Sequence, residues 1–235
     1  MAAVKHWVIV PAAGNSRRMG EVFQPKQYLP LVGRTVLEWA LAPFLGRTDC
    51  NGIIVVLARD DKLWRNSQLS SHPKVTTAIG GTERADSVRA GLVALAGRAD
   101  DRDWVLVHDA ARPCLRAEDL DRLLRELQDD EVGGLLAAPV VDTLKRADEE
   151  SRVAETVSRS ALWRALTPQM FRLGVLRQAL SAAQERNISV TDEAQAIEAL
   201  GLHPRLVAGD PDNVKVTVAE DLQRAERMLR SWNVP

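Results

Sequence analysis

Short apolar runs alternate with amphipathic helical segments along most of this chain, and that alternation limits the folds it can adopt. The runs are rich in Val, Ile and Leu with few polar residues between them, which is typical of parallel strands covered on both faces. We expect strands at His6–Val10, Gly52–Ala58, Lys74–Ile79, Trp104–His108 and Gly134–Ala138. The rhythm predicts an α/β fold with a doubly wound, mostly parallel, Rossmann-like sheet. Such sheets bind ligands at the carboxyl ends of their strands.

Helix boundaries can be predicted from capping residues. The capping box Thr35–Glu38 should begin a helix that Pro43 bends or shortens. A second capping box, Thr217–Glu220, should begin the last helix. Further helices are expected at Arg84–Ala96, Ala117–Gln128, Leu173–Arg186 and Asp192–Leu200, the last with Thr191 as its N-cap. Two short strands are expected at Pro204–Ala208 and Val214–Val216.

The α/β rhythm stops after Pro139, where two polar, extended runs flank a charged turn. These runs, Val140–Arg146 and Arg152–Ser158, predict a protruding β-hairpin arm over residues 139–160. An isolated two-stranded hairpin is marginally stable in water, so the arm should pack on a partner subunit or on its own domain. A mobile surface loop is the remaining alternative. Apart from the arm, we expect residues 1–235 to form a single domain, with no second domain fused after it.

Charge and composition exclude several classes of protein. The chain has 31 Lys and Arg against 32 Asp and Glu, a net charge of −1, which argues against a globally basic nucleic-acid binder. Its apolar runs fall far short of the ~20 residues that a membrane-spanning helix needs. The first residues read as a strand rather than a signal peptide, and two cysteines cannot form a disulfide framework. We therefore expect a cytoplasmic protein with no membrane or nucleic-acid partner.

The segment after the first strand is suited to a phosphate-rich ligand. Small residues from Pro11 to Gly14 let the backbone approach a ligand closely, and successive N–H groups in such a turn form an anion-binding nest. Arg17, Arg18 and Lys26 add positive charge. The segment matches neither the dinucleotide-binding nor the Walker pattern, so those classes are disfavoured. A surface turn with solvated arginines is the alternative.

Two further strand ends carry polar residues. At Gly80–Gly81 a strand ends and a helix follows, so backbone amides and the Ser87 hydroxyl could recognise a base edge. Another buried strand delivers His108, Asp109 and Arg112 to the edge where sites form. Asp109 could hold Mg²⁺ directly or through water, and Arg112 could bind a phosphate. His108 is more typical of a buried structural histidine than of a catalytic base.

Together these motifs resemble the sugar-phosphate nucleotidyltransferases, and more specifically the 2-C-methyl-D-erythritol 4-phosphate cytidylyltransferase family. The motifs that carry the resemblance are Pro11–Gly14, Pro25–Tyr28, Gly80–Val88, His108–Pro113, Asp142–Arg146, Leu166–Gln169, Thr191–Glu193 and Asn213–Thr217. The resemblance covers essentially the whole chain and implies a nucleotidyltransferase-type sheet. It implies transfer of CMP from CTP to a sugar-alcohol phosphate with release of pyrophosphate, Mg²⁺ bound with CTP, and a homodimer whose arm, residues 139–160, reaches the neighbour's active site.

The resemblance also implies roles for individual residues. Arg18 and Lys26 would stabilise the transition state, while Arg159 and Lys215 would orient the substrate phosphate. The implied CTP-binding residues are Pro11, Ala12, Ala13, Gly14, Gly80, Gly81, Arg84 and Ser87. The implied substrate-binding residues are Asp109, Arg112, Thr143, Thr167 and Thr191, with Asp109 also the implied metal ligand. Thr143 and Arg159 would serve the partner's site.

The chemistry needs no activated nucleophile. The second pKa of a phosphate monoester is ~6, so the attacking oxygen is already largely ionised at neutral pH. Positioning and electrostatic stabilisation should therefore do most of the work. Two alternatives stay open: a cytidylyltransferase that uses ribitol 5-phosphate, and a module that binds CTP without turnover.

Overall fold

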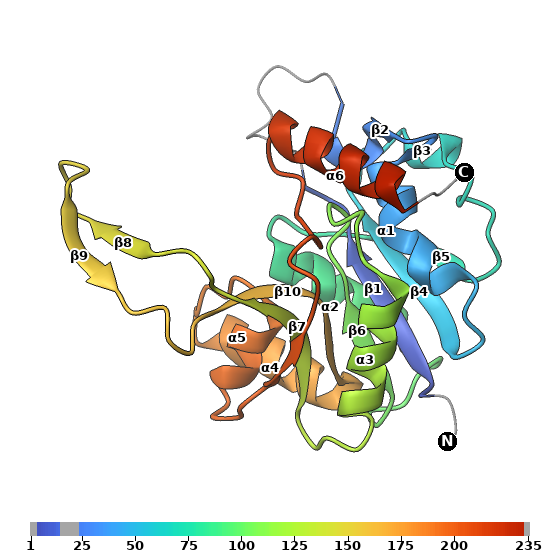
Figure 1. The fold of residues 1–235 in the computed structure, drawn as a ribbon. Coiled ribbons are helices and arrows are strands. Elements are labelled where there is room, and N and C mark those ends of the chain that lie inside the picture. Colours follow the sequence, from blue (N-terminus) through green and yellow to red (C-terminus); the bar gives the residue numbers. More distant parts are fainter. Residues whose placement is uncertain (1–3, 15–23, 233–235) are drawn as a thin grey trace.

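A mixed seven-stranded sheet forms the centre of the computed structural model, which describes residues 4–14 and 24–232. The strand order is β11-β7-β10-β6-β1-β4-β5 (Figure 1). The strands are β1 (His6–Pro11), β4 (Cys50–Leu57), β5 (Val75–Ile79), β6 (Trp104–Val107), β7 (Gly133–Pro139), β10 (Trp163–Arg172) and β11 (Arg205–Ala208). Neighbours run parallel except β10, which is antiparallel to both β6 and β7. The predicted doubly wound, mostly parallel sheet is confirmed.

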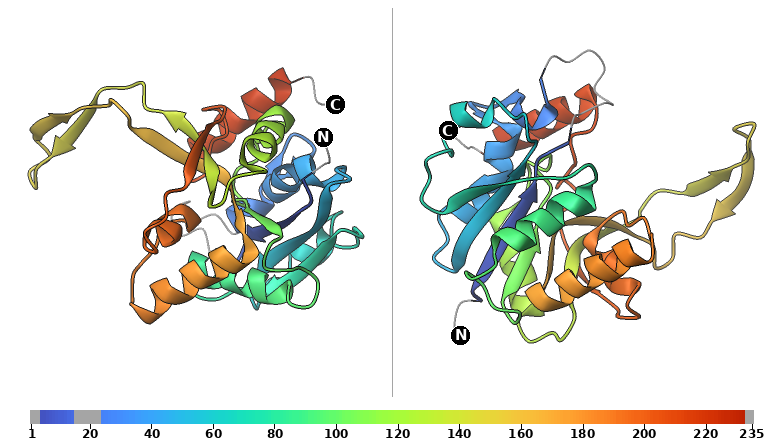
Figure 2. Two further views of the ribbon diagram at one scale, coloured as in Figure 1. Left: turned by 90° about the horizontal axis from the view of Figure 1, so that it is seen from below. Right: turned by 180° about the vertical axis from the view of Figure 1, so that it is seen from behind.

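Helices cover both faces of this sheet (Figure 1; Figure 2). They are α1 (Val36–Leu45), α2 (Arg84–Ala94), α3 (Ala117–Leu127), α4 (Leu173–Glu185), α5 (Glu193–Glu198) and α6 (Ala219–Ser231). Because side chains alternate along a strand, Val8 and Val10 pack toward α1 and α3, whereas Trp7 and Ile9 pack toward α2 and α4. The last helix, α6, packs its buried residues on the outer side of α1. The result is a sheet buried on both faces, with its strand ends left for a site.

The helix starts agree only partly with the predicted caps. The Thr35 hydroxyl accepts the Glu38 amide at 3.2 Å and the Glu38 carboxylate accepts the Thr35 amide at 2.8 Å, so this capping box is confirmed. The helix it begins includes Pro43 near its end and continues to Leu45. Pro43 therefore does not stop the helix where it stands.

Two other predicted caps are wrong. The N-cap of α5 is Asp192, whose carboxylate accepts the Gln195 amide at 3.0 Å, rather than Thr191. At the start of α6, the acid that accepts the Thr217 amide at 2.8 Å is Asp221, not Glu220. In both cases the acceptor is the carboxylate one position after the predicted residue, and it accepts backbone amides at the start of the helix. A charged acceptor suits the positive end of a helix.

Two strand predictions also need correction. Sequence analysis missed β10, because Pro168 and its polar neighbours interrupt the apolar pattern in the middle of the strand. The register of β10 against β7 shifts between Ala165 and Gln169, so this irregularity accommodates the proline. Val214–Val216 was predicted as a strand but has none of the ladder pairing of a strand in the described chain. It is an extended segment tied to the β6 side by a bond from the Val216 amide to the Ala111 carbonyl at 2.8 Å.

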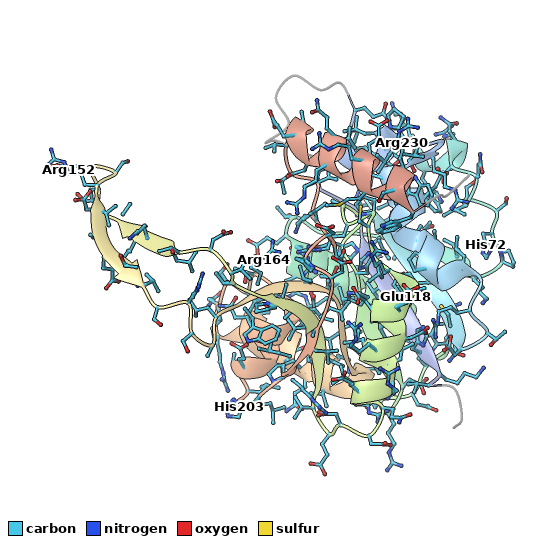
Figure 3. All side chains as sticks on the ribbon, viewed as in Figure 1. His72, Glu118, Arg152, Arg164, His203 and Arg230 are labelled. Atoms are coloured by element: carbon cyan, nitrogen blue, oxygen red, sulfur yellow. The ribbon has the colours of Figure 1, made fainter. Side chains whose placement is uncertain are left out.

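The predicted arm is a β-hairpin that projects from the body. Its strands, β8 (Leu144–Ala147) and β9 (Val153–Val157), pair antiparallel, and the hairpin extends far to the left in Figure 1. Figure 3 shows Arg152 at its tip, with side chains along the arm projecting outward. Val141 and Val153 are 71% and 65% exposed, respectively. The hairpin form is confirmed, and it presents apolar side chains beyond the domain.

Several short elements complete the fold. The strands β2 (Pro30–Leu31) and β3 (Arg34–Thr35) form a short hairpin ahead of α1. Short 3₁₀ helices cover Lys26–Tyr28 and Trp64–Asn66. No helix in the described part of the chain is long and apolar enough to cross a membrane.

Candidate active site

The loop after β1 is fastened on two sides. Pro11 ends the strand, and the Ala12 amide donates to the Val56 carbonyl at 2.8 Å. The buried amide of Gln27 donates to the Ala12 carbonyl at 2.7 Å. These bonds hold the small-residue loop beside the short helix that begins with Lys26. The loop and Lys26, both predicted to meet CTP, are therefore neighbours. Arg18 lies outside the described residues.

The turn after β5 meets this loop directly. A Cβ atom added to Gly80 would lie 2.6 Å from the Ser87 hydroxyl and 2.7 Å from the Ala13 Cβ, closer than real side chains approach. A Cβ at Gly81 would lie 2.3 Å from the Cβ of Asp86. The glycine pair is thus required by packing between the loop and the start of α2. Residues from two separate predicted motifs, Ala13 from one and Gly80 and Ser87 from the other, come together at the carboxyl ends of strands.

A buried carboxylate gathers positive charge at the end of β6. Asp109 lies 2.9 Å from the Lys215 ammonium, 3.2 Å from Arg84 Nε and 3.3 Å from Arg112 Nε. Burial alone would raise the pKa of Asp109, but Arg84, Lys215 and Arg112 outweigh it and hold that pKa well below its usual range. Asp109 is therefore ionised, and it joins α2, the β6 end and the segment around residue 215.

Arg84 also pairs with an acid, Glu193, that lies in a predicted motif but has no role assigned from the sequence. Its Nη1 and Nη2 atoms donate to the two oxygens of Glu193 at 2.5 Å and 3.0 Å, a bidentate pair. Burial would lower the pKa of Arg84, but Glu193 and Asp109 more than reverse this and raise it. Glu193 is almost completely buried at the start of α5. The pair therefore joins helix α2 to the start of α5, next to Thr191.

Arg112 and Lys215 differ in what they can offer a ligand. Arg112 donates to the Asn213 carbonyl at 2.6 Å and to the Ala165 carbonyl at 3.4 Å, and its side chain is 11% exposed. The Lys215 side chain is 38% exposed, compared with 27% for Arg84. Of these three cations, Lys215 is the most accessible to a substrate phosphate.

His108 is a buried structural histidine, as predicted. Its Nδ1 lies 2.9 Å from the Thr167 hydroxyl, and its Nε2 lies 3.1 Å from the Arg112 carbonyl. Its ring meets Phe44 edge to face, with 5.6 Å between centroids. Burial lowers the pKa of His108 to about 4, so the ring is neutral at pH 7. Both ring nitrogens already face partners within the protein.

Two further buried amides support the site, and sequence analysis did not assign them. Gln169 donates to Asp192 at 3.0 Å and accepts the Ala194 amide at 2.8 Å, which ties β10 to the start of α5. Asn213 donates to the Thr167 carbonyl at 2.7 Å. Thr191 is exposed beside them and donates to Gln195 at 3.1 Å. Both amides lie in motifs that the resemblance uses, but nothing local to them reveals their partners.

Two predicted site residues lie on the arm. Thr143 and Arg159 are exposed, and the arm extends away from the body that holds the Asp109 cluster (Figure 1). The Arg159 guanidinium donates to the Val141 carbonyl within the arm. This contact lies within the arm and does not link Arg159 to the Asp109 cluster.

Comparison with known proteins identifies the family. The family model for 2-C-methyl-D-erythritol 4-phosphate cytidylyltransferase matches residues 6–231. The chain belongs to this family. A curated cytidylyltransferase of this name from Ectopseudomonas mendocina is 56% identical over 221 residues, covering 94% of each chain. One from Pseudomonas putida is 55% identical over 218 residues, covering 92% of each.

Solved structures of the same cytidylyltransferase family share the fold. The enzyme from Francisella tularensis is 34% identical with a TM-score of 0.82, covering 95% of this chain and 99% of that one. The enzyme from Thermus thermophilus is 32% identical with a TM-score of 0.78, covering 98% of this chain and 100% of that one. These matches agree with the resemblance drawn from the motifs, over essentially the whole cytidylyltransferase chain.

Proposed function

We propose that this protein transfers the CMP group of CTP to 2-C-methyl-D-erythritol 4-phosphate, the cytidylyltransferase step of isoprenoid biosynthesis. The observation that carries the proposal is the meeting of two parts at one sheet edge. A tightly packed loop and turn, Ala13 with Gly80 and Ser87, adjoins a cluster of cations around Asp109. In a chain of this family, the first part suits a nucleotide and the second suits a sugar phosphate.

The reaction makes one bond and breaks one. An oxygen of the sugar phosphate attacks the α-phosphorus of CTP, and the bond from that phosphorus to the bridging oxygen breaks. The bridging oxygen takes the electron pair and leaves as pyrophosphate. Since the second pKa of a phosphate monoester is ~6, the attacking group is already a dianion at neutral pH. His108 is buried and both of its ring nitrogens are hydrogen-bonded, and it is not needed as a base.

Cations then stabilise the charge that develops at the α-phosphate. We assign this role to Lys26, which adjoins the loop through its neighbour Gln27, and to Arg18, which lies outside the described residues. Pre-positioned charges of this kind act mainly on the transition state. Pro11, Ala12, Ala13, Gly14, Gly80, Gly81 and Ser87 would line the CTP site, with Arg84 beneath it.

The sugar phosphate would bind beside Asp109. Lys215 has the accessible ammonium, and its partner Asp109 keeps it in place until the substrate phosphate arrives. We assign Arg112, which donates to the Asn213 carbonyl two residues before Lys215, and the exposed Thr191 to binding of the same substrate. We assign orientation of the substrate phosphate to Lys215 together with Arg159 of the arm.

The residues fit a magnesium ion held chiefly by the phosphates of CTP. Mg²⁺ typically binds one or two carboxylates plus substrate phosphates and keeps several waters. Asp109 offers one ionised carboxylate, and within residues 4–14 and 24–232 no group of three His, Cys, Asp or Glu side chains forms a fuller ligand set. Asp109 would hold the ion directly or through water. The bound ion would neutralise part of the charge on the triphosphate.

We also infer a homodimer in which the arm completes the neighbour's site. The arm carries Thr143 and Arg159, and it presents exposed Val141 and Val153 outside its own domain. A hairpin of this kind needs a surface to pack on. A two-fold dimer would provide one and would bring both polar residues to the partner's sugar phosphate.

An assay of pyrophosphate release tests the function. The purified protein should release pyrophosphate from CTP with Mg²⁺ when 2-C-methyl-D-erythritol 4-phosphate is present. Ribitol 5-phosphate and buffer alone serve as the competing acceptor and the blank. Pyrophosphate release with ribitol 5-phosphate instead would identify the protein as a ribitol 5-phosphate cytidylyltransferase. CTP binding without pyrophosphate release in the presence of either acceptor would indicate a binding module.

Variants connect the activity to the site. Lys215→Ala should raise the KM for the sugar phosphate, because it removes the accessible cation of the cluster. Lys62→Ala, an exposed lysine on the loop after β4, is the matched control and should leave the kinetics unchanged. Equal effects of the two substitutions would contradict the placement of the phosphate.

A further inference from the structure

Three side-chain and backbone groups join His108 to the turn that follows β6. The Asp109 amide lies 3.1 Å from the Thr167 hydroxyl, that hydroxyl lies 2.9 Å from His108 Nδ1, and His108 Nε2 lies 3.1 Å from the Arg112 carbonyl. The turn itself is closed by a bond from the Arg112 amide to the Asp109 carbonyl at 3.0 Å. His108 and Thr167 therefore bridge the same turn a second time.

These groups form a chain of hydrogen bonds, and the groups at its two ends, the Asp109 amide and the Arg112 carbonyl, fix the position of every proton in it. A carbonyl can only accept, so His108 Nε2 must carry the proton that it donates to Arg112. The neutral ring then has no proton on Nδ1, which must accept one from Thr167. The Thr167 oxygen in turn accepts from the Asp109 amide, which can only donate. The opposite ring tautomer would set an unprotonated nitrogen against the Arg112 carbonyl.

We propose that His108, as the Nε2–H tautomer, is a positioning residue that acts through Thr167 to hold Asp109 and Arg112 for the sugar phosphate. This inference rests on the proposed function and deepens it. Asp109 and Arg112 are the first and last residues of the turn, so a shift at either end moves a charged side chain of the cluster. The packing of Phe44 against the ring holds the imidazole in the orientation that these hydrogen bonds require.

The placement of these protons also bears on Thr167, which the family resemblance implies to be a substrate-binding residue. Its single hydroxyl proton points to His108 and one lone pair accepts from Asp109, so the hydroxyl has no proton left to give to a substrate. Thr167 is also buried, and its carbonyl accepts from Asn213. We therefore assign Thr167 to positioning rather than to donation toward the sugar phosphate.

The tautomer can be measured without any substrate. The chain has four histidines, so labelling them with ¹⁵N gives few signals, and a His108→Gln variant assigns the one from His108. The protonated and unprotonated ring nitrogens have well-separated shifts. We expect His108 to be protonated at Nε2 in the folded protein at pH 7. Protonation at Nδ1 would overturn the proposal.

Kinetics of two Thr167 variants test the positioning role. Thr167→Val replaces the hydroxyl with a methyl group of similar size and removes the hydrogen bonds that link Asp109 to His108. Thr167→Ser keeps the hydroxyl. A misplaced reacting group costs on the order of 10²-fold, so we expect kcat/KM for the sugar phosphate to fall that far in Thr167→Val. The KM for CTP should stay unchanged, and Thr167→Ser should restore most of the activity.

The pattern of changes in kcat and in the two KM values separates a positioning role from partial unfolding of the variant. A smaller folded fraction lowers kcat and leaves both KM values unchanged, whereas the proposal requires the KM for the sugar phosphate alone to rise. Equal behaviour of the Val and Ser variants would overturn it. If Thr167→Val does not fold, the ring tautomer and the Ser variant still decide. Inactivity of the unaltered protein toward every acceptor would instead refute the proposed function.

Discussion

Asp109 sets the charge that an arriving phosphate meets. Three cations, Arg84, Arg112 and Lys215, surround two acids, Asp109 and Glu193, so the cluster has one net positive charge. Because the pKa of Asp109 is held well below its usual range, Asp109 keeps its negative charge across the physiological pH range. A dianionic phosphate can therefore replace Asp109 as the partner of Lys215 without Asp109 changing its protonation.

The cations on the CTP side should act on turnover. Replacing Lys26 or Arg18 by Ala removes a charge that is assigned to the transition state rather than to CTP binding. Loss of such a donor typically costs roughly 10²–10³ in kcat, and we expect a smaller change in the KM for CTP. Steady-state kinetics with varied CTP measures both values. Near-normal turnover in either variant would remove that residue from the mechanism.

The pH dependence of the reaction should come from the substrate. Since the attacking phosphate must be a dianion, kcat/KM for the sugar phosphate should rise through pH ~6, the second pKa of a phosphate monoester. A His108→Asn variant should be less active and yet keep this rising limb, because the His108 ring is already neutral there. A pH profile of both proteins checks this. Disappearance of the limb in a folded variant would make His108 a general base.

Sequence reasoning reached some site residues and missed others for a physical reason. His108, Asp109 and Arg112 follow a buried strand directly, so their place at the sheet edge could be predicted. Glu193 meets Arg84 across 109 positions of the chain, and no local pattern around either residue reveals the pair. Contacts of this kind are set by the fold and not by nearby residues.

Among the elements, the turn after β5 tolerates no side chain at its first glycine. A Gly80→Ala variant puts a methyl group 2.6 Å from the Ser87 hydroxyl and 2.7 Å from the Ala13 Cβ, so the loop and the start of α2 must separate. We expect a higher KM for CTP and little change in the KM for the sugar phosphate. Initial-rate measurements with each substrate varied in turn test this.

A matched glycine controls for the general effect of the substitution. Gly46, at the end of α1, has no atom within 4 Å of an added Cβ, so Gly46→Ala should leave both KM values unchanged. An unchanged KM for CTP in Gly80→Ala would show that CTP does not depend on this packing.

Strand prediction failed where polarity and burial disagree. The central parallel strands are uniformly apolar, and their ranges could be predicted to within a few residues. By contrast, β10 carries Thr167, Pro168 and Gln169 in the sheet centre, where Thr167 and Gln169 are buried but hydrogen-bonded to His108 and Asp192. Val214 and Val216 show the reverse, because they are apolar and buried but lie in a loop that crosses the strand ends.

At the scale of the whole molecule, two buried histidines link stability to pH. An unfolded histidine titrates near 6.5, while burial lowers the pKa of His108 to about 4 and also lowers that of His6. The unfolded chain therefore binds more protons below pH 6.5, and the stability present above that pH is lost as the pH falls. For His108 the loss between pH 7 and pH 5 is about 2 kcal/mol, with His6 adding in the same direction.

Urea unfolding at pH 7 and pH 5, at one fixed protein concentration, measures this loss. His6→Gln should reduce it, because the variant removes a buried histidine whose pKa is lowered in the folded protein. His6 is the first residue of β1, at the opposite end of the strand from the site. His203→Gln, an exposed residue in Figure 3, is the control and should leave it unchanged. Equal unfolding free energies at the two pH values would contradict the assignment.

In the proposed homodimer the arm would make the site a property of two chains, and mixing inactive variants tests this proposal. Homodimers of Lys26→Ala and of Arg159→Ala should each be nearly inactive. In a mixed dimer, one site would hold both substitutions and the other neither. Random pairing makes about half the dimers mixed, so activity should recover to roughly a quarter of the wild-type value. Absence of recovery, with mixed dimers shown by mass spectrometry, would exclude a shared site.

The place of β10 in the sheet governs the order in which the molecule can be assembled. This strand joins β6 to β7, yet it follows both in the chain. During synthesis, the sheet that contains β1, β4, β5 and β6 can form while β7 waits for its neighbour. Glu193 and Lys215 emerge later still, so Arg84 and Asp109 gain their full set of partners last. Until β10 pairs with it, β6 presents an open edge, and a chain that stalls before residue 172 is open to aggregation and to proteases.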